Sequence, residues 1–376
     1  MNVIVAMDSF KGSLTALQAC EAVKKGLSVA LDGTFSLIPM GDGGEGTAEC
    51  MAAACGGKMV FETVPDLFGR EKRCGYADLG NGVAVIETAM AAGIADLKPE
   101  ERDVLRASTY GVGFQIRRAM DLGYKKIIVG LGGSATTDGG LGALQALGVV
   151  FYDKNGKKIP DGAGGGVLQE IVRAEKGDLK IPLDCEIVYA CDVTNPYYGL
   201  TGAAHVYGPQ KGADPDTVLL LDEGLRSFAK VLAECFGGDI SEVPGAGAAG
   251  GLCGGLLAAL GGTVRSGFDI LAEASLLEEK IASADFVITG EGKTDGQTAF
   301  GKLPCRLGEM AKKYGVPAIL ISGSVASSAE DLYEHGIAAL FDTVPSPMSL
   351  DSAIGYAAEN LEFTAKNVGN LISKLL

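Results

Sequence analysis

One segment near the middle of the chain reads Ile127-Ile128-Val129-Gly130-Leu131-Gly132-Gly133-Ser134-Ala135-Thr136-Thr137-Asp138-Gly139-Gly140. Its apolar start predicts a buried strand, its glycines and hydroxyls predict a tight loop, and the residues from Gly140 predict a helix. Other apolar runs also stop abruptly at Gly, Ser or an acid, namely 3–6, 36–39, 187–191, 286–289 and 318–321. Helical patterns follow most of these runs, as at 14–30, 46–54, 140–147 and 304–314. The repetition of strand, loop and helix predicts an α/β fold with buried parallel strands and right-handed crossovers.

The region 61–92 has a different pattern, with short alternating runs broken by turn residues. Asn81-Gly82 is a hairpin signal, and a second turn-rich patch covers 154–166. We therefore predict an inserted mixed α/β domain over about 63–275. The other domain is then discontinuous and is built from 1–62 and 276–376.

Composition excludes several classes of function. The 376 residues include 32 Lys and Arg against 47 Asp and Glu, which gives a net charge of −15. A basic footprint for nucleic acid is therefore absent, and attraction to anionic membranes is not expected. The chain has nine Cys without a Cys-x-x-Cys motif, which predicts a reduced, cytoplasmic protein. Because only two His occur, a His-based triad or a His-rich metal site is not expected.

Six loop-like segments each carry a carboxylate, usually among glycines. They are 8–13, 41–46, 132–140, 191–196, 208–214 and 290–298. Glycine lets a backbone approach a ligand, carboxylates hold a metal or take a proton, and lysines and hydroxyls stand beside them. Most of these segments follow predicted strands, and ligands of open α/β sheets bind at that edge. The combination is typical of proteins that handle phosphates through Mg²⁺.

The sequence contains partial matches to two nucleotide-binding motifs. Gly292-Lys293-Thr294 resembles the end of a Walker A loop, but Val287 stands where the first glycine is required. The segment 245–250 matches the dinucleotide fingerprint by letters, but 239–244 does not predict the strand that should precede it. We interpret this segment as a phosphate or substrate loop and keep an NAD-linked hydroxyacid dehydrogenase as an alternative.

Seven ordered strings together resemble the type 1 family of glycerate kinases. They are Asp-Ser-Phe-Lys-Gly-Ser at 8–13, Asp-Gly-Gly-Glu-Gly-Thr at 42–47, Gly-Gly-Ser-Ala-Thr-Thr-Asp-Gly-Gly at 132–140, Ala-Cys-Asp-Val-Thr-Asn-Pro at 190–196, Gly-Pro-Gln-Lys-Gly-Ala at 208–213, Pro-Gly-Ala-Gly-Ala-Ala-Gly-Gly at 244–251, and Gly-Glu-Gly at 290–292 with Asp295 and Gln297-Thr298. The chain departs from the family's usual sequence at Tyr197, where Leu is usual, and at Cys305-Arg306. Neither departure removes a carboxylate.

The resemblance implies an ATP- and Mg²⁺-dependent kinase that converts D-glycerate to 2-phosphoglycerate and ADP in glyoxylate or sugar-diacid breakdown. It also implies a Rossmann-like, flavodoxin-like domain, an inserted α/β domain, and an active site in the cleft between them. The expected partners are ATP and D-glycerate, with no nucleic acid and no membrane.

The candidate site residues fall into three groups. The catalytic candidates are Asp192 as general base or hydroxyl-positioning group, Asn195, Lys11 and Asp8. The candidates for binding ATP or phosphate are Gly133, Ser134, Thr136, Thr137, Lys211, Lys293 and Gly247. The candidates for holding the metal are Asp42, Glu45, Asp295 and Glu291. Individual roles within this set are interchangeable on the sequence alone.

Three alternatives remain open. A glycerate 3-kinase would give 3-phosphoglycerate from the same residues. A hydroxyacid dehydrogenase would bind NAD(H) at 245–250, and a non-catalytic sensor would bind glycerate without Mg²⁺. The sequence also leaves a homo-oligomer open.

Overall fold

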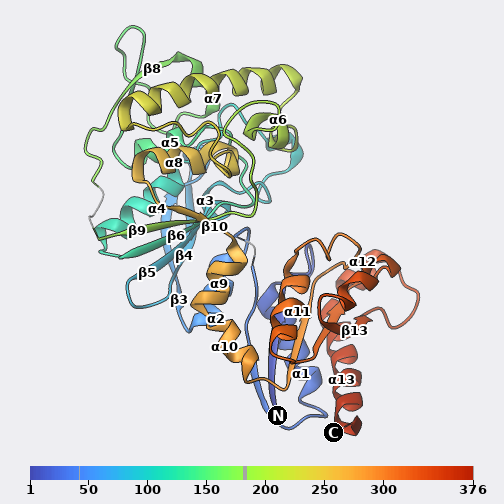
Figure 1. Ribbon diagram of the computed structural model, residues 1–376. Helices are drawn as coiled ribbons and strands as arrows, with labels where there is room; N and C mark the ends of the chain where they lie inside the picture. Colours follow the sequence, from blue (N-terminus) through green and yellow to red (C-terminus); the bar gives the residue numbers. More distant parts are fainter. Residues whose placement is uncertain (42, 181–183, 376) are drawn as a thin grey trace. The chain divides into compact units, whose positions relative to one another are not determined.

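The computed structural model describes residues 1–41, 43–180 and 184–375, which form two compact units (Figure 1). The first unit contains Met1–Gly41, Glu49–Gly56 and the chain from Phe268 onward, and the second contains residues 43–48 and Gly57–Gly267. The two-domain α/β prediction is therefore confirmed. Strand β3 (Lys58–Pro65) pairs along its whole length with β4 (Glu71–Asp78), and both strands belong to the second unit.

The first unit is built on a five-stranded parallel sheet with the order β13-β12-β11-β1-β2. The strands are β1 (Asn2–Met7), β2 (Thr34–Leu37), β11 (Phe286–Gly290), β12 (Ala318–Ser322) and β13 (Ile337–Asp342). Their register pairs Met7 of β1 with Gly290 of β11. The chain proceeds from β1 to β2 on one side and from β11 to β12 on the other, so the order reverses between β1 and β11. Ligands of open α/β sheets bind at such switch points.

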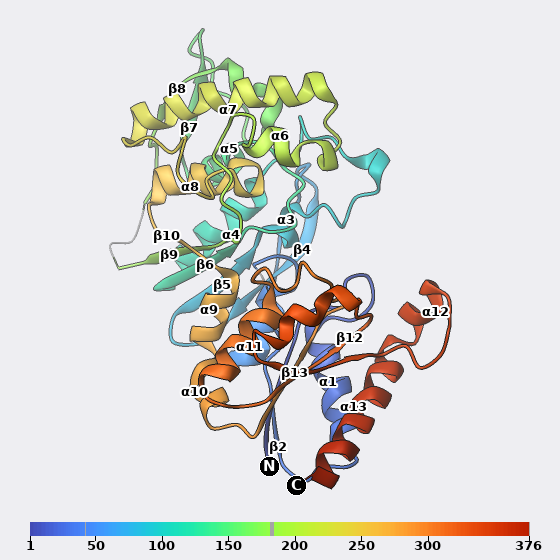
Figure 2. The same ribbon diagram turned by 45° about the vertical axis from the view of Figure 1, so that its right-hand side comes forward.

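Helices cover this sheet. Helices α1 (Ala16–Leu27) and α13 (Ala357–Leu375) run side by side and pack on Val3 and Val5 of β1 (Figures 1 and 2). Helix α1 begins at a capping box, in which Thr15 Oγ1 accepts from the Gln18 N–H and Gln18 Oε1 accepts from the Thr15 N–H. The unit also contains most of α2 (Thr47–Cys55) and of α9 (Gly267–Ala274), together with α10 (Leu277–Ala282), α11 (Leu303–Lys313), the 3-10 helix η5 (Ser327–Tyr333) and α12 (Leu350–Gly355).

The second unit is built on a six-stranded mixed sheet with the order β10-β9-β6-β5-β4-β3. The other strands are β5 (Val83–Glu87), β6 (Lys126–Gly130), β9 (Glu186–Ala190) and β10 (Thr263–Arg265). Strands β5, β6, β9 and β10 are parallel, while β4 pairs antiparallel with β5. The predicted Asn81-Gly82 turn joins β4 to β5, and Asn81 has a φ of 50° there.

One apolar core runs through the second unit. Figure 1 shows α5 (Leu141–Ala146) and α8 (Leu252–Leu260) between the sheet and the long helix α7 (Pro215–Phe236). Helix α4 (Tyr110–Asp121) packs on β3 and β5, and its Val112 and Ile116 are fully buried. The remaining elements are α3 (Thr88–Ala92), η1 (Pro99–Glu101), β7 (Val150–Asp153), η2 (Gly165–Glu170), β8 (Ile171–Glu175), α6 (Ala203–Tyr207), η3 (Pro209–Lys211) and η4 (Ala248–Gly251).

The uncharged stretch 243–264 is divided among turns, η4, α8 and β10. In the described part of the chain, no helix has both the length and the apolar character needed to cross a bilayer.

Candidate active site

Two acidic residues lie together at the switch point of the first sheet. Asp8 follows the last residue of β1, Glu291 follows the last residue of β11, and the preceding residues are paired in register. The Asp8 N–H donates to Gly290 O at 2.9 Å, which keeps the two chains side by side beyond the strands. Asp8 Oδ1 accepts from the Ser9 N–H at 2.6 Å. The structure therefore brings Asp8 and Glu291 to one edge, as their positions after strands predict.

Glu291 is buried in a network of hydroxyls. Its Oε1 accepts from Thr298 Oγ1 at 2.7 Å and from Thr294 Oγ1 at 3.1 Å. Ser322, at the end of β12, accepts from the Glu291 N–H at 3.2 Å and lies 2.8 Å from Thr294 Oγ1. All three hydroxyl residues are fully buried. Because one carboxylate oxygen is held by two donors, the direction of the carboxylate is fixed before any ligand binds.

Asp295 and Lys293 lie in the loop after β11. Asp295 accepts from the Gln297 N–H at 3.0 Å, and Lys293 Nζ lies 3.3 Å from its carboxylate. The Gln297 N–H, followed by Lys293, lowers the pKa of Asp295 below its ordinary value. Lys293 is largely exposed. Lys11 is also exposed, in the turn that the Phe10 N–H closes onto Leu14 O at 2.9 Å.

At the second sheet, the segment 43–48 lies across the carboxyl ends of β5 and β6. Glu87, the buried last residue of β5, accepts from the Gly46 N–H at 3.1 Å and from the Ala48 N–H. The Gly132 N–H donates to Gly43 O at 3.0 Å. A Cβ on Gly132 would lie 2.5 Å from Gly44 Cα, so only glycine permits this approach. The segment presents Glu45 to solvent, while Asp42 lies outside the described residues.

Lys211 is the buried cation of the second unit, with 3% of its surface exposed. Its Nζ donates to Ser134 Oγ at 2.9 Å and to Thr136 O at 2.6 Å. Burial lowers the pKa of Lys211 to about 7, against an ordinary value of 10.5. The structure thus joins three of the predicted phosphate-binding residues into one cluster.

Asp138 supports the same loop from inside. It accepts from the Thr109 N–H at 2.8 Å, the Thr109 hydroxyl at 2.8 Å, the Gly140 N–H at 3.0 Å and the Gly142 N–H at 3.1 Å. The Thr109 hydroxyl donates to Asp138 and also accepts from the Ala143 N–H at 2.9 Å. Burial raises the pKa of Asp138, and the Thr109, Gly140 and Gly142 donors oppose that shift.

The hydroxyls of Thr136 and Thr137 are fully buried, and neither oxygen has a hydrogen-bond partner within the part of the chain described. A buried polar atom without a partner costs about 1–3 kcal/mol, so such atoms are uncommon in folded proteins. Gly133 begins this loop with a φ of 73°, and its carbonyl accepts from the Ile94 N–H at 2.9 Å. The orphaned hydroxyls beside a buried ammonium fit a loop that acquires a polar ligand.

Asp192 follows β9 and is exposed, whereas Asn195 is tied into its own loop. Asn195 Nδ2 donates to Thr201 O at 2.8 Å, and Asn195 Oδ1 accepts from the Tyr207 hydroxyl at 2.7 Å. Both ends of the amide are therefore used. This geometry gives Asn195 the role of fixing the loop that carries Asp192.

Gly247 is packed against that loop. A Cβ on Gly247 would lie 2.2 Å from Pro196 O, and its N–H donates to Asn195 O at 3.0 Å. The N–H of Gly247 therefore forms an internal hydrogen bond, and the role of Gly247 in binding phosphate stays a prediction. The residues 237–247 contain no strand, so the dinucleotide fingerprint lacks the element it requires.

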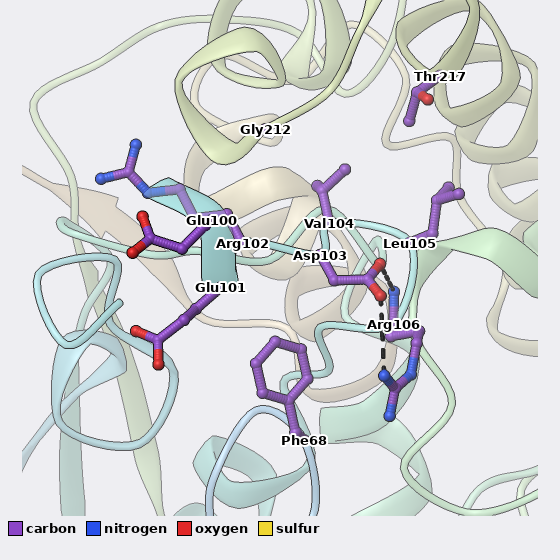
Figure 3. A pocket seen from close by; sticks show the side chains of 10 residues that line it. All are labelled: Phe68, Glu100, Glu101, Arg102, Asp103, Val104, Leu105, Arg106, Gly212 and Thr217. Atoms are coloured by element: carbon purple, nitrogen blue, oxygen red, sulfur yellow. Dashed lines mark hydrogen bonds and ion pairs between the residues drawn. The ribbon is translucent and has the colours of Figure 1, made fainter. Parts of the chain in front are cut away.

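A cavity of about 410 Å³ is lined in part by Gly212, the residue after Lys211 (Figure 3). Its lining includes Phe68 and Gly212, together with acids and arginines of 100–106, and Figure 3 shows Asp103 joined to Arg106. Arg102 donates to Gln210 O at 3.0 Å. None of the predicted site residues lines this cavity.

Sequence reasoning missed several residues of these two edges. Glu87 is not among the predicted site residues. The apolar run 83–86 ends at this acid, as other apolar runs of the chain end at acids, and that pattern could have identified it. The partnership of Thr294, Thr298 and Ser322 with Glu291 joins residues of two loops, and nothing in their spacing signals it.

Comparisons with known proteins give a consistent family. The sequence profile of the glycerate kinase family matches residues 3–373. The chain is 44% identical to a glycerate kinase of Halalkalibacterium halodurans, over 98% of this chain and 97% of the relative. It is 40% identical to glycerate 2-kinase of Escherichia coli K12, with the same coverage. Among solved structures, it resembles a protein assigned as glycerate kinase 2 of Salmonella typhimurium LT2, with a TM-score of 0.87, 38% identity, and coverage of 100% and 98%.

Proposed function

The chain belongs to the glycerate kinase family, and on that premise we propose that it transfers the γ-phosphoryl group of ATP to O2 of D-glycerate, giving 2-phosphoglycerate and ADP. One observation carries the proposal beyond the family. The parallel strands β1, β5, β9 and β11 each end at, or within two residues of, a carboxylate: Asp8, Glu87, Asp192 and Glu291. Phosphoryl transfer requires positioned charge and a metal more than covalent chemistry, which agrees with a site made of acids, lysines and hydroxyls.

In the first unit, Glu291 and Asp295 are the residues that would hold Mg²⁺. The donor set fits, because Mg²⁺ takes one or two carboxylates together with waters and phosphate oxygens. Glu291 is already oriented by Thr294 and Thr298. When bound, the ion would neutralise charge on the phosphates. Asp8 follows the strand beside that of Glu291 at the same sheet edge, and Glu45 and Asp42 stay candidates by their sequence position alone.

Asp192 is our choice for the group that orients the attacking hydroxyl and accepts its proton. Its exposure leaves the carboxylate accessible to a substrate, and Asn195 fixes the loop below it. Lys11 is free to neutralise a substrate carboxylate at the surface of the first unit. Lys293 is placed to balance Asp295.

Lys211 would provide a positive charge to an anion bound at the 132–138 loop, to which its ammonium is hydrogen-bonded. An anion bound at this loop would raise the lowered pKa of Lys211, so binding would be accompanied by proton uptake near neutral pH. Gly133, Ser134, Thr136 and Thr137 form the surrounding loop and would supply polar contacts to phosphate. We leave Gly247 out of these contacts because its N–H is used internally.

The decisive experiment is ³¹P NMR of the purified protein with ATP, Mg²⁺ and D-glycerate. The expected result is a 2-phosphoglycerate signal that grows in step with ADP. A 3-phosphoglycerate signal would keep the kinase and replace the O2 assignment with the 3-kinase alternative. The name of the E. coli relative, glycerate 2-kinase, supports phosphorylation at O2.

We place the reaction in glyoxylate or sugar-diacid breakdown, in the cytoplasm. All nine cysteines are free, which supports a reducing compartment.

Asp192→Asn tests the proposed base. The exchange preserves size and fold, and kcat should fall at least about 100-fold because general-base catalysis contributes that much. Asp161→Asn is the matched control, since Asp161 is an exposed carboxylate that pairs with Lys158 at the surface. Near-normal turnover of Asp192→Asn would remove Asp192 from this role.

The two rival classes make different binding predictions. A hydroxyacid dehydrogenase would quench or enhance NADH fluorescence on binding, and the missing strand before 245–250 argues against it. A sensor would bind D-glycerate in calorimetry without Mg²⁺ and without forming ADP. Product formation in the NMR experiment excludes the sensor.

A further inference from the structure

A group of three potential metal ligands lies in the first unit, and none of the three belongs to the Glu291 network. Cys305 Sγ, a carboxylate oxygen of Glu309 and a ring nitrogen of His335 all lie within 4.8 Å of one another. His335 Nδ1 is 2.8 Å from Glu309 Oε1. We propose that these three side chains bind a divalent ion of borderline softness, with Zn²⁺ as the natural occupant and a water as fourth ligand.

The ligand types select this class of ion. Zn²⁺ accepts thiolate, imidazole and carboxylate ligands in tetrahedral sites, with bonds of about 2.0–2.3 Å. Hard ions such as Mg²⁺ prefer oxygen ligands throughout, so a thiolate and an imidazole disfavour them. Three protein ligands leave one tetrahedral position for water.

Helix α11 presents two of the ligands on one face. Cys305 and Glu309 are four residues apart, a spacing that places side chains one above the other along a helix. The thiol of Cys305 is buried, whereas the side chain of Glu309 is 57% exposed and that of His335 is 33% exposed. The group therefore has an internal anchor and an open side through which an ion can enter.

The backbone fixes the third ligand against this face. A Cβ on Gly308 would lie 2.6 Å from His335 O, so glycine at 308 lets the turn that carries His335 rest directly on α11. Lys312 Nζ donates to Glu334 O at 2.7 Å and holds the same turn from the next part of the helix. Gly336 has a φ of 91°, which ends the turn before β13. These contacts position His335 without any contribution from an ion.

Ion binding changes the hydrogen bonds of Cys305. Its thiol donates to Ala299 O at 3.3 Å. Because a cysteine binds a metal ion as the thiolate, coordination removes the thiol proton and breaks this hydrogen bond. The released carbonyl belongs to the residue after Thr298, which donates to Glu291.

Cobalt(II) titration of the untagged protein in thiol-free buffer tests the site. We expect one equivalent to give near-ultraviolet thiolate-to-cobalt charge-transfer absorption and the visible bands of four-coordinate cobalt, with Zn²⁺ displacing both. His335→Ala should weaken cobalt binding at least about 10-fold, since even residues that only orient a ligand contribute about 10–100-fold. Cys305→Ser should abolish the charge-transfer band.

Matched controls come from the other histidine and from a partly buried cysteine of the second unit. His205→Ala and Cys235→Ser should retain the full titration, because both residues belong to the second unit. A rise in Tm with Zn²⁺ that is present in both controls and absent in His335→Ala would support the site independently of cysteine replacement. No thiolate band, or a band that survives in Cys305→Ser, would overturn the proposal.

Discussion

The ammonium of Lys211 lies 2.9 Å from Ser134 Oγ, although 77 residues separate the two along the chain. The contact joins the short helix η3 to the loop that follows β6. Because the ammonium also donates to Thr136 O, two hydrogen bonds join Lys211 to this loop. Removal of this cation should therefore change both the loop and the pH dependence of stability.

Lys211→Met tests the charge of this buried group. The folded protein binds fewer protons at Lys211 than the unfolded chain between about pH 7, the lowered pKa, and about pH 10.5. Stability linked to this group therefore rises as pH rises through that window. The slope of unfolding free energy against pH should be steeper in the native protein than in Lys211→Met by up to about 1.4 kcal/mol per pH unit. Denaturant unfolding at several pH values measures it.

Lys230→Met serves as the control for that experiment, since Lys230 is exposed on α7. Its slope should equal that of the native protein. The interpretation fails if Lys211→Met shows the native slope.

Glu87→Gln tests the support of the 43–48 segment. The exchange replaces a charged acceptor of the Gly46 and Ala48 N–H groups with a neutral one. Loss of this charge-assisted pairing should cost about 1–3 kcal/mol and accelerate hydrogen exchange at the two amides. Glu186→Gln, at the exposed first residue of β9, should change neither. Native exchange rates at Gly46 and Ala48 in Glu87→Gln would show that other contacts hold the segment.

Glu291→Gln separates charge from hydrogen bonding in the first unit. The amide oxygen still accepts from Thr294 and Thr298, so thermal unfolding should stay close to that of the native protein. If the carboxylate holds Mg²⁺, kcat/KM should fall at least about 100-fold, and more Mg²⁺ should be needed for half-maximal rate. ADP release over a Mg²⁺ series gives both values. Glu330→Gln, at an exposed position of η5, is the control, and an unchanged Mg²⁺ dependence in Glu291→Gln would exclude Glu291 as a ligand.

Gly247→Ala tests the packing of the 245–251 loop. The new Cβ would stand 2.2 Å from Pro196 O, so the backbone must shift at a cost of about 1–3 kcal/mol. Because Asn195 and Pro196 belong to the loop of Asp192, kcat should fall as well. Gly355→Ala meets nothing within 4 Å and should leave Tm and kcat unchanged. Native stability of Gly247→Ala would mean that the loop is loosely packed.

Much of the fold could be predicted because its signals are local. The runs 127–129, 286–289 and 318–321 all lie within observed strands, and the Asn81-Gly82 turn joins β4 to β5. Buried β-branched runs and turn glycines determine their own backbone conformation through sterics and burial. The predicted run 36–39 lies later than β2 (Thr34–Leu37), because β2 ends where its pairing with Val5 ends.

Only part of the candidate site could be predicted, because only some of its features are specified by local sequence signals. Position after a strand identified Asp8, Asp192 and Glu291, since the carboxyl ends of parallel strands share an edge. The use of both ends of the Asn195 amide, and of the Gly247 N–H, depends on neighbours that no spacing specifies. The place of the site between the two domains stays a prediction of the sequence.

The sequence by itself determined the α/β class, the acidic glycine loops and the family, because each is specified by residues that are adjacent along the chain. Only the tertiary structure decided that Glu87 holds the 43–48 segment, that Lys211 reaches Ser134, and that Cys305 meets His335. These pairs depend on strand order and on close helix contacts across long stretches of chain. Packing of the whole domain fixes them, and the local conformational preferences that a sequence reveals do not.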